Sequence, residues 1–172
     1  MTRLERLREL ERSTGRPVRV ALVGAGQMGR GLAAQVGRIP GLELALAVDV
    51  DGGRASDALV AAGHAAPESD VDRAGEALDA GRGLALTTFE ALPELDVDVV
   101  VEATGVPEIG ARVAETAMGG GKHVVMLNVE TDVTVGLALA DIARRNGVVY
   151  SIADGDEPVC AKELVDFAHE LA

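Results

Sequence analysis

The sequence predicts an α/β fold, doubly wound around a mainly parallel sheet. An apolar run rich in β-branched residues, 18–23, leads directly into the turn Gly24-Ala25-Gly26-Gln27-Met28-Gly29, and a helical pattern follows. Strand-like and helix-like segments then alternate along the rest of the 172 residues. Hydrophobic residues make up 48% of the chain and aromatic residues only 2%, which suits parallel strands covered by helices on both faces.

The turn after the first strand has the Gly-x-Gly-x-x-Gly spacing of dinucleotide-binding turns. Gly24 permits the tight turn, Gly26 lets a pyrophosphate approach the backbone, and Gly29 lets the helix lie close to the strand. The helix N-terminus offers free N–H groups and the positive end of its dipole. A glycine-rich turn without a ligand is the alternative. The predicted cofactor-binding residues are Gly24, Ala25, Gly26, Gln27, Met28 and Gly29.

The second predicted strand, 42–48, ends at Asp49, about 20 residues after Gly29. An acidic side chain at this position accepts hydrogen bonds from the ribose hydroxyls of adenosine. Asp49 and Asp51 would repel a 2′-phosphate, whereas Arg54 would accommodate one. The predicted cofactor is therefore NAD or NADP, with NAD slightly favoured, and another adenine cofactor such as S-adenosylmethionine is a weaker alternative.

Hydrophobic periodicity and turn residues predict the remaining elements. Further strands are expected at 84–88, 97–103, 123–127 and 148–152. Helices are expected at 2–13, from the glycine turn to about 39, and at 53–63, 71–80, 107–118, 134–146 and 158–172. The first helix would pack outside the sheet or contact another subunit. The predicted division is an N-terminal helix at 1–16, a nucleotide-binding domain at 17–153, and a C-terminal helix at 154–172 that begins a further region.

Ligands of open parallel sheets bind beyond the carboxyl ends of the strands. Thr104 and Gly105 follow one predicted strand and would lie beside the nicotinamide half of the cofactor, or would only form a strand-ending turn. Asn128 and Glu130 follow the next strand and are the candidates nearest the reacting carbon. The alternative for Asn128 is a helix cap, and for Glu130 an acid at a helix end.

Charge and cysteine content exclude several classes of function. The net charge of −12 disfavours binding to nucleic acids and anionic membranes. No run approaches the roughly 18 apolar residues of a membrane-spanning helix. Cys160 is the only cysteine, which fits a cytoplasmic protein without an internal disulfide. The acids in 154–157 are expected to favour a helix N-terminus, so no metal site is predicted.

Several blocks in the second half of the chain resemble the cofactor domain of homoserine dehydrogenase-type oxidoreductases. They are Asp98-Val99-Val100-Val101-Glu102-Ala103-Thr104-Gly105, then Gly121-Lys122-His123-Val124-Val125, then Asn128. The segments 126–136 and 150–158 resemble a subgroup often described as carrying a C-terminal SAF domain, which includes reductoisomerase-like enzymes acting on deoxyxylulose phosphate. Val129 departs from the typical lysine of homoserine dehydrogenases, which argues against homoserine as the substrate.

This resemblance implies a Rossmann domain of an NAD(P)-dependent oxidoreductase. The enzyme would transfer a hydride between the cofactor and a small hydroxylated or phosphorylated carbonyl substrate. By this resemblance, the family's catalytic region lies beyond Ala172, and the chain is expected to form a homo-oligomer or to be completed by a second domain or chain. The alternative is a stand-alone module that binds NAD(H) or senses redox state without catalysis.

Overall fold

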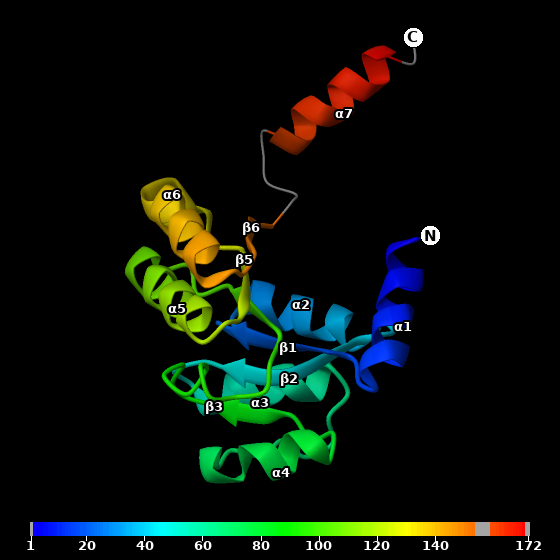
Figure 1. Cartoon of the computed structure of the whole chain (residues 1–172), viewed down its shortest axis with the longest axis vertical. Coiled ribbons are helices and arrows are strands. Elements are labelled where there is room, and N and C mark those ends of the chain that lie inside the picture. Colours follow the sequence, from blue (N-terminus) through cyan, green and yellow to red (C-terminus); the bar gives the residue numbers. More distant parts are fainter. Residues whose placement is uncertain (1, 154–158, 171–172) are drawn as a thin grey trace.

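A sheet of six parallel strands runs through the molecule (Figure 1). The computed structural model describes residues 2–153 and 159–170. The strand order is β3-β2-β1-β4-β5-β6, and every neighbouring pair in it is parallel. The chain starts at the centre, winds outward to β3, returns beside β1 and winds outward to β6. The predicted doubly wound α/β architecture is confirmed.

The chain contains short strands and helices of one to five turns. The strands are β1 (Val18–Val23), β2 (Leu42–Val48), β3 (Leu84–Leu86), β4 (Val99–Glu102), β5 (His123–Met126) and β6 (Tyr150–Ile152). The α-helices are α1 (Arg3–Thr14), α2 (Gln27–Val36), α3 (Gly52–Ala61), α4 (Ala74–Asp79), α5 (Pro107–Gly119), α6 (Val129–Asn146) and α7 (Val159–Glu170). A short 3-10 helix, Val71–Arg73, precedes α4.

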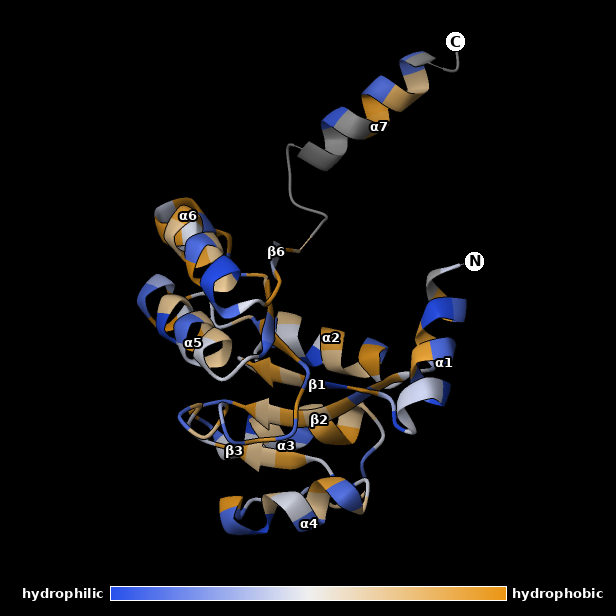
Figure 2. Cartoon of the chain, in the orientation of Figure 1, coloured by the Kyte–Doolittle hydropathy of each residue, from blue (hydrophilic) through white to orange (hydrophobic). Residues whose placement is uncertain are grey.

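The core consists of two apolar layers, one on each face of the sheet. Val20, Leu22 and Leu44 pack with the buried sides of α2 and α3. Ala21, Val23 and Val100 pack with α4, α5 and α6 on the other face. Alternate residues of β1 thus enter opposite layers, as a strand buried on both faces requires. Figure 2 shows the apolar central strands and the polar outer sides of the helices.

The start of α6 differs from the sequence prediction. The helix begins at Val129 instead of Thr134, because the Asn128 side chain caps it. Asn128 Oδ1 accepts the N–H of Thr131 at 3.2 Å, and Glu130 follows in the positively polarised first turn. The β-branched residues in this turn have low helix propensity, so periodicity alone places the start too late.

The predicted domain boundaries, which set off an N-terminal helix at 1–16 and a C-terminal helix at 154–172, remain predictions. Helix α1 starts with a capping box between Thr2 and Glu5 and ends at Gly15 in the left-handed conformation. Leu7 is half-buried and packs near Gly41, but Leu4 and Leu10 stay exposed. The predicted acidic segment before α7 lies outside the described residues.

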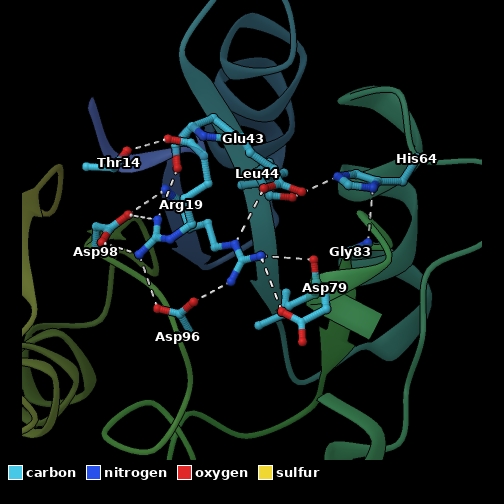
Figure 3. A network of polar contacts seen from close by, with 12 residues as sticks. Thr14, Arg19, Glu43, Leu44, His64, Asp79, Gly83, Asp96 and Asp98 are labelled. Carbon is cyan, nitrogen blue, oxygen red and sulfur yellow. Dashed lines mark hydrogen bonds and ion pairs between the residues drawn. The ribbon is translucent and has the colours of Figure 1, made fainter. Parts of the chain in front are cut away.

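A polar network lies at the amino-terminal edge of the sheet (Figure 3). Arg19 of β1 is buried, and its guanidinium donates to Asp96 and, at 3.0 Å, to the Leu78 carbonyl oxygen. Arg16 binds both carboxylate oxygens of Asp98, at 2.7 and 3.0 Å. These contacts tie β1 to the segment before β4 and to α4. They lie at the edge opposite the glycine turn.

Candidate cofactor site

The glycine turn is packed against the ends of two strands. The Gly24 N–H donates to the Val48 carbonyl oxygen at 2.8 Å, and Gly24 has a φ of 98°. A Cβ at Gly24 would lie 2.6 Å from the Ala103 carbonyl group, and one at Gly29 would lie 2.0 Å from the Gly24 oxygen. Gly24 and Gly29 are therefore required by the close approach of backbone to backbone, which agrees with the roles predicted for them.

Gly26 is different, because the space above it is open. It is the N-cap of α2, with a φ of −66°, and a Cβ there would meet no atom within 4 Å. The first-turn N–H groups of a helix have no acceptor within the helix, and no N-cap side chain accepts from them here. Gln27 and Met28 are exposed, Met28 by 72%. The absence of a side chain at Gly26 thus serves no packing need of the described chain and leaves the helix N-terminus accessible to an anion.

Asp49 lies beside this turn at the end of β2. Its Oδ2 accepts the N–H of Ala25 at 2.8 Å, and its Oδ1 accepts the N–H of Asp51 at 3.0 Å. The carboxylate thus holds the glycine turn against the loop that follows β2. The Arg54 Nε lies 3.6 Å from Asp51 Oδ2, and both side chains are more than half exposed. The guanidinium is therefore only loosely held at the rim of the site.

A groove of about 390 Å³ runs along the carboxyl ends of β1, β2 and β4. It brings together four predicted positions, Gly24, Gly26, Asp49 and Thr104, but its lining also includes residues that were not predicted from the sequence. Thr88 and Phe89 line it from the irregular segment after β3, and Ile109 lines it from α5. A second hollow of about 730 Å³ adjoins it at Gly26 and Arg54 and is also lined by Arg30.

Two hydrogen bonds from backbone N–H groups to nearby side chains stabilise the segment after β4. The Thr104 N–H donates to Glu102 Oε1 at 2.8 Å, and Thr104 Oγ1 accepts the N–H of Val106 at 3.3 Å. Gly105 has a φ of 69°, which glycine adopts without strain. Thr104 lines the groove, and Gly105 follows it at the exposed rim. A cofactor in the groove could therefore reach both residues, and their contact with it remains a prediction.

Asn128 and Glu130 are less directly placed for chemistry. Asn128 is 3% exposed, and its Oδ1 is occupied as the cap of α6. Glu130 is exposed in the first turn of that helix. Neither lines the groove described above. Their catalytic roles remain predictions. The alternative role of Asn128, as a helix cap, is observed in the structure.

Glu102 is the buried acid of the site, and the sequence analysis did not single it out as a site residue. It is the last residue of β4 and is 0% exposed. Burial raises the pKa of its carboxyl group, although the nearby Thr104 and Asn128 groups favour the charged form. A lone acid within an otherwise apolar strand is the signal that would have pointed to it.

The residues at this edge fit a dinucleotide. The uncapped N-terminus of α2 suits a pyrophosphate, and the partly buried carboxylate of Asp49 suits ribose hydroxyls. Among the described residues, no three His, Cys, Asp or Glu side chains form a group that could hold a metal ion. In the same part of the chain, no helix has the length and apolar character needed to cross a membrane.

Comparison with solved structures reveals proteins that share this fold. A homoserine dehydrogenase from Thiobacillus denitrificans is 24% identical, with a TM-score of 0.54 over 80% of this chain and 29% of that one. GenD2 from gentamicin A biosynthesis, in complex with NAD, is 25% identical, with a TM-score of 0.59 over 80% and 34%. KijD10, a 3-ketoreductase from Actinomadura kijaniata in complex with NADP, is 23% identical, with a TM-score of 0.57 over 79% and 38%.

The chain spans about a third of the length of these structures. No protein among those with curated descriptions matches it. The sequence profile of the homoserine dehydrogenase NAD-binding domain, however, matches residues 24–152, from the first glycine of the turn to the end of β6. The predicted family and its nicotinamide dinucleotide cofactor are thereby confirmed. The chain belongs to the family of homoserine dehydrogenase NAD-binding domains.

Proposed function

We propose that this chain is the cofactor-binding part of an oxidoreductase that transfers a hydride between NAD(P) and a small hydroxylated or phosphorylated carbonyl substrate. The observation that carries the proposal is the open N-terminus of α2 at Gly26, with Asp49 held beside it. The nicotinamide ring supplies the hydride chemistry when the cofactor is bound, and the protein supplies binding and orientation.

The pyrophosphate and the adenosine of the cofactor have matching groups on the protein. The pyrophosphate would accept hydrogen bonds from the first-turn N–H groups of α2, at Gln27 and Met28. The adenosine ribose would donate to Asp49, and the adenine would lie in the groove near Thr88. The nicotinamide half would then extend past Thr104 along the same edge of the sheet.

The charges favour NAD over NADP. A 2′-phosphate would meet the carboxylate of Asp49, which cannot move away without giving up its bonds to Ala25 and Asp51. Arg54 and Arg30 line the neighbouring hollow and would partly offset this repulsion. Arg54, however, already lies 3.6 Å from Asp51 at an exposed position. We therefore expect NAD to bind more tightly.

The substrate would be a small molecule with a hydroxyl or ketone group, and sugar-like substrates are the leading candidates. GenD2 takes part in the synthesis of gentamicin A, and KijD10 is a 3-ketoreductase. Because this chain spans about a third of those proteins, catalysis would require a second domain or chain. Asn128 and Glu130 remain the candidate catalytic residues, and membership of the SAF-domain subgroup remains part of the proposal.

A fluorescence titration tests the proposal on the chain as it is. NADH emission is followed as the purified protein is added, and bound NADH is then displaced with ADP-ribose or with nicotinamide mononucleotide. We expect ADP-ribose to displace NADH and the mononucleotide to compete weakly, because the recognisable contacts lie on the adenosine side. Failure of ADP-ribose to displace bound NADH would contradict the proposed orientation.

A further inference from the structure

Three buried polar side chains lie beneath the segment that follows β4. Glu102 ends β4, Asn128 precedes α6, and Thr131 belongs to the first turn of α6. Their exposed fractions are 0%, 3% and 0%. Polar groups in such positions cost free energy unless they are hydrogen-bonded, so their arrangement calls for an explanation.

One carboxylate oxygen of Glu102 accepts a hydrogen bond and the other does not. Oε1 accepts the N–H of Thr104 at 2.8 Å, which fixes the backbone directly after the strand. Oε2 is buried and has no hydrogen-bond partner among the described residues. The strand end is also tied to the next one, since the Glu102 carbonyl oxygen accepts the N–H of Leu127 at 2.8 Å.

Asn128 has an unpaired hydrogen-bond donor. Its Oδ1 caps α6 through the N–H of Thr131, but its Nδ2 has no hydrogen-bond partner in the described structure. A Cβ placed on Gly110 would lie 2.9 Å from Glu102 Oε2 and 3.0 Å from Asn128 Nδ2, so the two atoms are less than 6 Å apart. An unpaired acceptor and an unpaired donor therefore lie around the same point beside Gly110 of α5. The Thr131 hydroxyl lies nearest to that point, at 2.4 Å from the same Cβ position, and it donates to the Pro107 carbonyl oxygen at 3.2 Å.

We propose that Glu102 is a positioning residue for the nicotinamide half of the cofactor. One carboxylate oxygen holds the Thr104 backbone, and the other pairs with the Asn128 amide through a small shift of either side chain. The carboxylate thereby joins the segment after β4, which lines the groove through Thr104, to the start of α6. Glu102 acts through Thr104 and Asn128 and does not touch the cofactor, because it is fully buried. This inference rests on the proposed function, since it requires a dinucleotide in that groove.

The substitution Glu102→Gln tests the inference with little change in shape. The glutamine oxygen still accepts the Thr104 N–H, but its amide group presents a donor where Asn128 also presents a donor. We compare the Kd values of NADH and ADP-ribose for the purified chain, because ADP-ribose lacks only the nicotinamide. We expect the Kd of NADH to rise about tenfold, as for the loss of about one hydrogen bond, and that of ADP-ribose to stay within about twofold.

Matched variants separate positioning from stability. Asn128→Asp keeps the oxygen that caps α6 but replaces the unpaired donor, so it should reproduce the selective loss of NADH affinity. Glu115→Gln, at an exposed position of α5, should change neither affinity. Equal losses for NADH and ADP-ribose, or an unchanged NADH affinity in Glu102→Gln, would overturn the inference. A wild-type chain that binds neither ligand would instead refute the proposed function, and the inference with it.

Discussion

Replacing Gly26 with valine should abolish dinucleotide binding while leaving the fold intact. Gly26 has a φ of −66° and a ψ of −165°, a conformation that any residue adopts. A Cβ at this position would meet no atom within 4 Å. The Cβ of the new side chain therefore clashes with no atom of the protein, and the free energy of unfolding should change by less than about 1 kcal/mol.

The loss of binding follows from what the new side chain would cover. Valine at Gly26 would fill the space through which the pyrophosphate reaches the first-turn N–H groups of α2. Losing about two hydrogen bonds to a charged phosphate costs about 3 kcal/mol or more, which corresponds to at least a ~100-fold rise in Kd.

Two assays and one control variant test this prediction. Calorimetric titration with NADH measures the affinity, and urea denaturation measures the free energy of unfolding. Gly75→Ala is the matched control, because a Cβ there also meets no atom within 4 Å and α4 lies away from the glycine turn. If Gly26→Val bound NADH within threefold of the wild type, the pyrophosphate could not lie where we infer.

Three further substitutions test the packing, the cofactor preference and the pH dependence. Gly29→Ala should lower the free energy of unfolding by about 2–3 kcal/mol in urea denaturation, because its Cβ would lie 2.0 Å from the Gly24 oxygen. Asp49→Ser should narrow the preference for NAD over NADP about tenfold in calorimetric Kd values, because the carboxylate that repels a 2′-phosphate is gone. The hydrogen bonds from Arg16 hold the pKa of Asp98 below its usual range, so this pair contributes stability above about pH 4 that is lost as the pH falls through the lowered pKa. Asp98→Asn should therefore lower the free energy of unfolding by about 1–2 kcal/mol at pH 7. Between pH 7 and pH 3, the free energy of unfolding should then fall less in this variant than in the wild type, as measured by urea denaturation at both pH values.

Local signals explain why much of the fold was predictable. The strands at 18–23 and 42–48 were predicted with the bounds that the structure has, because β-branched and apolar runs end there at glycine and aspartate. The start of α6 was not, because capping by Asn128 outweighs the low helix propensity of the residues that follow. A cap depends on one side chain, and hydrophobic periodicity does not register it.

The site, like the fold, was predictable only where a local sequence pattern determines it. The glycine turn and Asp49 were found because their spacing along the chain is fixed by the strand-turn-helix unit. The contact from Asp49 to Ala25 and the lining by Phe89 were not, because they arise where irregular segments meet across the sheet. The burial of Glu102 likewise depends on the packing of α5 against β4, which no local pattern encodes.

The most direct test of the cofactor site is calorimetric titration of the purified chain with NAD, NADH, NADP and NADPH. We predict binding of the dinucleotides at one site per chain, with NAD and NADH tighter than their 2′-phosphorylated counterparts by about tenfold or more. A folded chain that binds none of the four would contradict the site itself. Tighter binding of NADP and NADPH would keep the site but contradict the role assigned to Asp49.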